Sequence, residues 1–142
     1  QLVEDGLALA WPEPAGRSCR QELLERDMLA RDGRLGLWSA VSRRQGRVAR
    51  RVVSAEMRRR VVYEGRVRSV KKGRSVTFVN FEGPRGKTPS FFVSRRLSVD
   101  FLRLGRDVAT FSGKRLRVRA ELVTTPALRL AVTTADGVEI LD

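Results

Sequence analysis

Hydrophobic and polar residues alternate through much of the second half of the chain. The alternation is clearest over residues 61–70, and shorter runs of the same kind occupy 75–81, 90–94 and 116–123. A period of two is typical of strands that bury one face. Two weaker runs follow at 128–132 and 138–141. We therefore expect this part of the chain to be mainly β.

The period changes once between the third and fourth of these runs. Leu97, Phe101, Leu102 and Leu104 recur at helical spacing, and Gly105 ends the pattern. Three strands, a helix and two or more further strands is the element order of an OB-fold. The fold class expected for residues 61–142 is thus mainly β with helices (α+β), as a small five-stranded, OB-fold-like Greek-key barrel.

The first forty residues have a different pattern. Ser18 stands where a helix N-cap is expected, with Gln21 three positions later. Apolar residues then recur at roughly helical intervals, which predicts a helix over about 18–36 that ends near Gly36. We expect this helical segment to bury Leu24, Met28, Leu35 and Trp38.

These patterns divide the chain into three parts. Residues 1–40 form the helical segment, 41–60 are an arginine-dense linker or basic helix, and 61–142 are the barrel. The sequence opens at Gln1 and runs at once into apolar residues, so we interpret its start as lying inside a domain whose upstream part is missing.

Composition narrows the chemistry. The chain has 142 residues, no histidine and one cysteine, so tetrahedral zinc sites and Ser–His or Cys–His nucleophiles lack their usual side chains. An intrachain disulfide is excluded because the chain has a single cysteine. No run of 18 apolar residues is present, which excludes a transmembrane helix at the sequence level.

Charge is the strongest single feature of the sequence. Lys and Arg number 29 against 16 Asp and Glu, a net charge of +13. Residues 41–74 alone carry thirteen basic and two acidic side chains, a net of +11. Arginine, which far outnumbers lysine, suits bidentate contact with phosphate. This excess of positive charge favours nucleic acid as the first candidate partner and an anionic membrane surface as the second.

An OB barrel binds single strands across its second and third strands, with aromatic rings stacking on bases and basic side chains following the backbone. Alternation allows only one of Phe78 and Phe81, and one of Phe91 and Phe92, to face outward; all four in the core is the other interpretation. The candidate nucleic-acid-binding residues are Arg66, Arg68, Lys71, Lys72, Arg74, Phe78, Phe81, Arg85, Lys87 and Phe91.

A further row of arginines falls on one face of the fourth predicted strand. Arg115, Arg117 and Arg119 are spaced two apart, and like charges at such short range are unfavourable. We therefore expect an anionic group to neutralise this row.

Several motifs resemble a known family. Gly6-Leu7-Ala8, the capped helix and Arg34-Leu35-Gly36-Leu37-Trp38 are similar to the C-terminal third of thermonuclease (staphylococcal-nuclease-like) proteins. The stretches 64–70, 77–81 and 111–118 resemble a barrel appended to the nuclease domain in some bacterial members. The resemblance covers most of the chain.

The resemblance implies calcium-dependent phosphodiester hydrolysis by acidic calcium ligands, a glutamate base and two arginines. All of these lie upstream of the region that matches Leu2, so the resemblance implies no catalytic residue, no metal ligand and no cofactor in this chain; calcium would belong to the missing upstream part. Trp11 falls near positions where the family places aromatic residues beside the bound base. Family members are often exported, and the sequence itself leaves localisation unknown.

Three functions stay open at this level. The favoured one is an accessory nucleic-acid-binding region, for single strands, of a thermonuclease-like protein. The others are a protein-interaction or structural OB module of an inactive nuclease homologue, and a module that binds polyanions or the cell envelope. The sequence does not decide between DNA and RNA. It also leaves open whether the helical segment packs against the barrel, against an upstream nuclease domain, or against another chain, as in a homo-oligomer.

Overall fold

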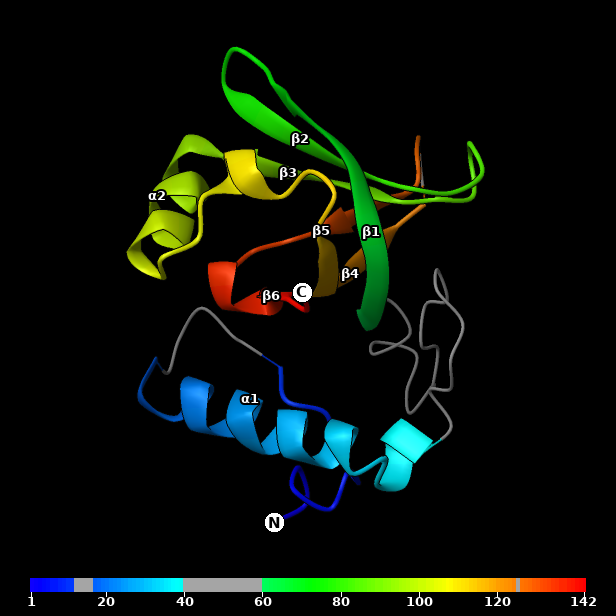
Figure 1. Ribbon diagram of the computed structural model, residues 1–142, viewed down its shortest axis with the longest axis vertical. Helices are drawn as coiled ribbons and strands as arrows, with labels where there is room; N and C mark the ends of the chain where they lie inside the picture. Colours follow the sequence, from blue (N-terminus) through cyan, green and yellow to red (C-terminus); the bar gives the residue numbers. More distant parts are fainter. Residues whose placement is uncertain (12–16, 40–59, 125) are drawn as a thin grey trace. The chain divides into compact units, whose positions relative to one another are not determined.

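The computed structural model describes residues 1–11, 17–39, 60–124 and 126–142, which belong to two compact units, Gln1–Arg44 and Gln45–Asp142 (Figure 1). The side chain of Ser18, the predicted cap, and residues 41–59 of the predicted basic segment lie outside this description.

The first unit is built on helix α1 (Arg17–Asp32) and the 3-10 turn η1 (Gly36–Ser39). The helix ends four residues before the predicted end at Gly36. Arg34 adopts the left-handed conformation with φ 54°, and the Leu35 N–H donates to the Ala30 carbonyl at 2.9 Å. The Arg34 N–H donates to the Arg31 carbonyl at 2.9 Å, which completes a Schellman motif.

The buried residues of this unit differ in part from those expected. Trp38 is buried as predicted, but Met28 and Leu35 are exposed, so that part of the prediction is wrong. The side of α1 that carries Asp27 and Ala30 is buried instead, and Asp27 Oδ1 accepts a hydrogen bond from the Ala10 N–H at 3.3 Å. The N-terminal segment thus covers a face of the helix that apolar periodicity does not mark.

Two glycines join the start of this unit to the end of its helix. The Leu37 N–H donates to the Gly6 carbonyl at 2.7 Å, and a Cβ added at Gly36 would lie 2.4 Å from the Gly6 oxygen. Gly36 also has a positive φ of 49°. Only glycine at position 36 therefore lets the two backbone segments approach this closely.

These geometries predict opposite effects for two neighbouring substitutions. Gly36→Ala should lower the stability of the unit by about 2 kcal/mol, because the methyl group would clash with backbone atoms. Arg34→Gly should raise it by about 0.5–1 kcal/mol, because glycine adopts the left-handed conformation without strain. Thermal unfolding followed by helical circular dichroism measures both; equal effects of the two changes would contradict this account.

The described residues of the second unit form a six-stranded sheet with one α-helix (Figure 1). The class mainly β with helices is confirmed, but the sheet has six strands where five were predicted. In chain order the elements are β1 (Arg60–Lys72), β2 (Val76–Phe81), β3 (Ser90–Ser94), α2 (Arg95–Arg103), η3 (Val108–Thr110), β4 (Arg115–Val123), β5 (Arg129–Ala131), η4 (Ala135–Gly137) and β6 (Val138–Ile140).

Five of the strands are paired in a ring. β1 pairs antiparallel with both β2 and β4, β2 pairs with β3, and β4 pairs with β5. The ring is completed by a parallel contact between β3 and β5 at Ser90 and Arg129. β6 is the added strand and pairs with β4. β1 can serve two neighbours because its 13 residues make it the longest strand.

A β-bulge in β1 changes which residues face outward. Val67 lies opposite Phe81 and Ser69 lies opposite Asn80, so one extra residue is present in β1 between these pairs. Val67 is buried and Val70 packs against the core, with two residues between them. Strict alternation would turn Lys71 to the same face as Val67. The bulge instead places exposed Lys71 opposite Phe78.

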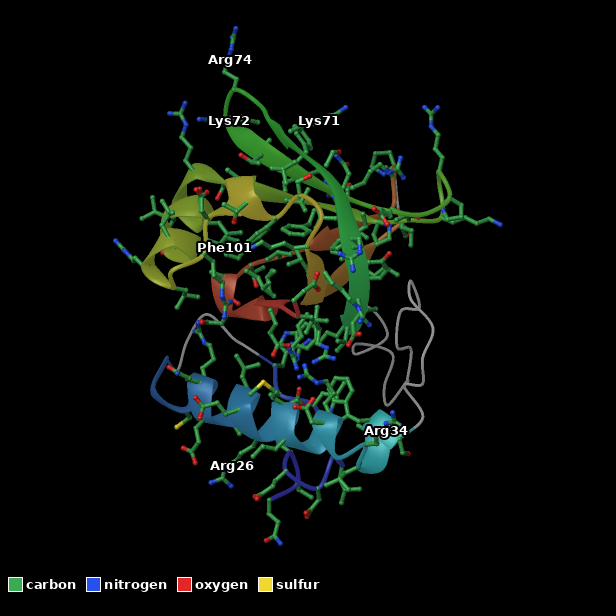
Figure 2. All side chains as sticks on the ribbon, in the orientation of Figure 1. Arg26, Arg34, Lys71, Lys72, Arg74 and Phe101 are labelled. Carbon is green, nitrogen blue, oxygen red and sulfur yellow. The ribbon has the colours of Figure 1, made fainter. Side chains whose placement is uncertain are left out.

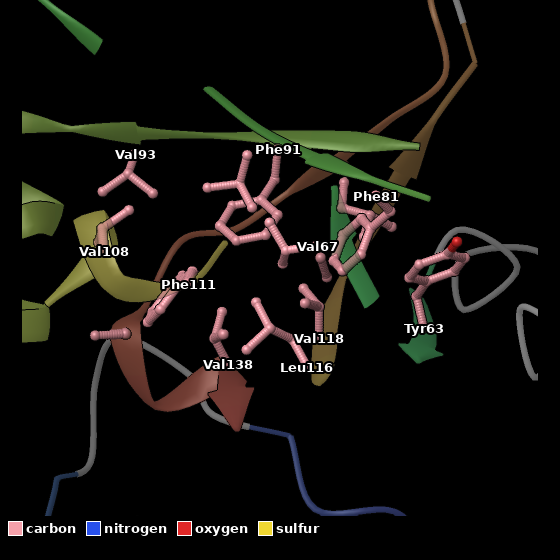
Figure 3. Packing of buried hydrophobic residues seen from close by; sticks show 14 of the residues in the cluster. Tyr63, Val67, Phe81, Phe91, Val93, Val108, Phe111, Leu116, Val118 and Val138 are labelled. Atoms are coloured by element: carbon pink, nitrogen blue, oxygen red, sulfur yellow. The ribbon is translucent and has the colours of Figure 1, made fainter. Parts of the chain in front are cut away.

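The core of the barrel is rich in phenylalanine (Figure 3). Phe101 of α2 meets Phe111 edge to face, with ring centroids 5.5 Å apart. Tyr63 and Phe81 meet in the same way at 4.9 Å. Ser94 caps α2 by accepting a hydrogen bond from the Leu97 N–H at 3.2 Å, and Leu97 and Phe101 are the buried residues of that helix.

Tyr63 makes the stability of the barrel depend on pH. Burial raises the pKa of its phenol above the ordinary value of 10.0. Above that value the unfolded chain ionises first, so the contribution of Tyr63 to stability is complete below about pH 10 and is lost as pH rises toward the folded pKa. In denaturant unfolding at increasing alkaline pH, the free energy of unfolding should fall less for Tyr63→Phe than for the unsubstituted protein. Because Tyr63 is the only tyrosine, tyrosinate absorbance measures its pKa directly, and an ordinary value would contradict the prediction.

Candidate nucleic-acid interface

Two phenylalanines lie side by side on the outer face of the barrel. Phe78 of β2 and Phe92 of β3 are direct cross-strand partners, and their rings meet edge to face with centroids 5.2 Å apart. Each is 37% exposed. An exposed aromatic pair on a sheet offers ring surface to a flat ligand.

The other two phenylalanines considered from the sequence lie in the core. Phe81 is 2% exposed and Phe91 is fully buried, with ring centroids 5.9 Å apart. Of the two interpretations for each phenylalanine pair, the structure thus places Phe81 and Phe91 in the core. Phe91 lies opposite buried Val79, so alternation along β3 turns Phe92 outward, and Phe92 is the site residue that the candidate set lacked.

Cations flank the aromatic pair at both ends. Lys71 of β1 lies opposite Phe78, and the guanidinium carbon of Arg129, in β5, lies 5.4 Å from the centroid of the Phe92 ring. That distance is in the range of a cation–π contact. We call Lys71, Phe78, Phe92 and Arg129 the aromatic row. Arg129 was missed because nothing local in the sequence relates β5 to β3.

A polar row runs beside the aromatic row. Ser69 lies opposite Asn80, and Asn80 lies opposite Ser90. The Asn80 side-chain amide donates to the Ser69 hydroxyl at 3.3 Å. All three residues are half-buried, and their hydroxyl and amide groups can donate and accept hydrogen bonds.

Three of the predicted basic residues lie in the two loops next to these rows, and a fourth, Lys72, is the last residue of β1. Lys72 and Arg74 are exposed at the β1–β2 hairpin, where Arg74 extends away from the sheet (Figure 2). Arg85 and Lys87 are exposed in the β2–β3 loop. The hairpin turn is closed by the Gly73 N–H, which donates to the Val76 carbonyl at 2.8 Å.

Arg66 and Arg68 are held by contacts within the barrel. Arg66 donates to the Gly113 carbonyl at 2.5 Å and to Asp142 at 3.2 Å. Arg68 donates to the Gly83 carbonyl at 3.0 Å and to the Phe81 carbonyl at 3.4 Å. These contacts direct Arg66 to the end of the chain and Arg68 to the end of β2, so neither belongs to the aromatic row.

The arginine row on β4 is neutralised within the fold. Glu64 of β1 and Glu139 of β6 lie opposite Arg117 on its two sides. Arg117 Nε donates to Glu64 at 2.6 Å, Arg115 lies 3.5 Å from Glu64, and Arg119 pairs with Glu139. The anionic partner expected from the sequence is therefore supplied by the neighbouring strands.

This arrangement predicts that Glu64 stabilises the fold without contributing to the aromatic row. Glu64→Gln should lower the free energy of unfolding by about 3 kcal/mol, because it leaves a buried guanidinium without its carboxylate. Exposed Glu121→Gln, which makes the same charge change on β4, should cost less than about 1 kcal/mol. Denaturant unfolding compares them, and equal losses would contradict the role given to Glu64.

The comparisons with known proteins identify no family. No family model matches the chain, and no curated protein matches it either. Among the described residues, no group of three or more His, Cys, Asp or Glu could hold a metal ion. Within the same residues, no helix is long and apolar enough to cross a membrane. The resemblance to thermonucleases thus stays a prediction from the sequence.

Proposed function

We propose that residues 60–142 form an OB-fold barrel that binds single-stranded nucleic acid on its outer face, as the accessory C-terminal part of a thermonuclease-like protein. The ring order β1-β2-β3-β5-β4, with α2 between the third and fourth strands, supports the OB-fold assignment. OB-folds bind oligonucleotides on the face of strands 2 and 3. The exposed aromatic pair lies on those two strands.

The aromatic row is the observation that carries the proposal. Base–aromatic stacking contributes about 1–3 kcal/mol per base and tolerates any base, because every base has a π-face. Bases in a duplex are already stacked on each other, so this mode selects single strands. The two cations at the ends of the row complement the phosphates that alternate with bases along a strand.

The size of the row fits a short stretch of nucleic acid. Its four residues lie on four adjacent strands, and neighbouring strands are about 4.8 Å apart, so the row spans about 14 Å. That length accommodates roughly two nucleotides with their phosphates. Arg74, Arg85 and Lys87 in the adjoining loops extend the positive surface for the strand beyond the row, whereas Lys72 follows Lys71 in β1 and turns by alternation to the other face of the hairpin.

The proposal predicts that aromatic and basic substitutions have different effects on binding. Phe78→Leu and Phe92→Leu should each weaken binding of a fluorescent oligonucleotide by about 1–3 kcal/mol, because leucine keeps the apolar bulk but cannot stack. Lys71→Gln and Arg129→Gln should each reduce the slope of log affinity against log salt by about 0.7, the value for one lost phosphate contact on a single strand. Fluorescence titrations in a salt series measure both quantities.

The controls separate this mode from general attraction to polyanions. Arg103→Gln makes the same charge change on α2 and should leave the affinity nearly unchanged. Heparin has charge but no bases, so its binding should fall with salt yet be indifferent to the phenylalanine changes. Equal binding of heparin and oligonucleotide, insensitive to Phe78 and Phe92, would refute the proposed function.

A further inference from the structure

A second surface of the barrel unit lies on α2. This helix buries Leu97 and Phe101 on one side, and its other side exposes Val99 and Leu102, which are 47% and 56% exposed. Leu104, the C-cap residue, is 44% exposed but lies seven residues after Leu97, toward the buried side of the helix. We call Val99 and Leu102 the α2 patch. Large aliphatic side chains exposed together on one short segment are a sign of an interaction surface.

Three arginines lie on the same helix as the α2 patch. Arg95 and Arg96 occupy the first turn of the helix and Arg103 its last turn, and all three are exposed. Asp100, the one acidic residue in α2, lies 3.5 Å from Arg103. Arg95 also donates to the Arg74 carbonyl at 3.1 Å, so the basic hairpin tip lies beside the start of the helix. The surroundings of the patch therefore have an excess of positive charge.

We propose that the α2 patch binds the surface of an anionic lipid bilayer. The aliphatic side chains would enter the boundary between headgroups and acyl chains, while Arg95, Arg96 and Arg103 contact lipid phosphates. A basic helix with an apolar face is the usual form of such an interfacial element. A second copy of this chain is a poor occupant, because two α2 helices would bring the same positive excess face to face.

The shape of the surface favours a bilayer over a peptide. Figure 1 shows α2 at the outer edge of the barrel unit, and its exposed side is the convex side of a helix. Peptide segments dock in grooves or on free sheet edges, whereas convex apolar side chains with cations beside them can insert into a planar interface. The α2 patch shares no residue with the aromatic row, so this proposal does not depend on the proposed nucleic-acid function.

Flotation of the full 142-residue chain with lipid vesicles tests the proposal. The chain should float with phosphatidylcholine vesicles that contain phosphatidylglycerol and stay unbound with phosphatidylcholine alone. Leu102→Ser should lower the partition coefficient about tenfold, by removing most of one inserted side chain. Arg96→Gln should lower it about fivefold, by removing one cation near the anionic surface. Both residues are exposed, and melting curves confirm that the variants fold.

Two matched variants make the test specific. Lys87→Gln makes the same charge change as Arg96→Gln but lies in the β2–β3 loop, and it should leave vesicle binding nearly unchanged. Phe92→Leu should weaken oligonucleotide binding and leave flotation intact, so failure of one proposal is distinguishable from failure of the other. Absence of flotation, an unchanged partition coefficient for Leu102→Ser, or equal losses for Arg96→Gln and Lys87→Gln would each overturn the proposal.

Discussion

The barrel depends on one strand, β1, which must pair with two neighbours along its length. Its first part, up to Arg66, lies against β4 and its last part, from Val67, lies against β2, and the bulge between Val67 and Ser69 lies at the start of the β2 ladder. A bulge bends a strand and increases its twist, which a strand needs in order to belong to both sides of a ring. The same extra residue turns Val70 to the core and Lys71 to the surface. The bulge in β1 thus contributes both to closure of the barrel and to the position of Lys71 in the aromatic row.

The arginine excess has two different uses in this fold. Arg115, Arg117 and Arg119 are matched to Glu64 and Glu139 through the strand register, and Arg66 and Arg68 bind carbonyl groups at loop ends. These five side chains hold parts of the chain together. The cations at the hairpin, in the β2–β3 loop and on α2 are exposed. Net charge alone therefore overstates the free positive surface, because Arg117 and Arg119 are buried and the other three guanidinium groups are bound to carbonyl or carboxylate oxygens of the fold.

Sequence patterns predicted the positions of helices and strands better than they predicted which side chains point to the core and which to the surface. The strands, the helix after β3 and its buried Leu97 and Phe101 follow from hydrophobic period, and the structure has them where they were expected. Alternation along a single strand does not show which of its faces is turned to the core, so each phenylalanine pair kept two interpretations. The bulge in β1, which no local motif marks, decides the faces of β1 residues such as Lys71, and the alignment of neighbouring strands is set by their register. Residues on different strands, such as Phe92 and Arg129, meet only through that register. The end of α1 was misjudged because an arginine, and not a glycine, adopts the left-handed conformation at Arg34.

The two ends of the aromatic row are held with unequal strength. Lys71 and Phe78 belong to a ladder of five registered pairs between β1 and β2. Arg129 lies in a three-residue strand whose contact with β3 is one parallel pair, and the Ser90 N–H donates to the Leu128 carbonyl at a long 3.4 Å. Segments with few backbone hydrogen bonds open at low free-energy cost. β5 is held mainly by its three registered pairs with β4, so the joint between β3 and β5 is the shortest ladder of the ring. Under the proposed function, this shortest ladder lies next to Phe92, one of the two rings on which a base would stack, whereas Phe78 lies within the ladder of five pairs.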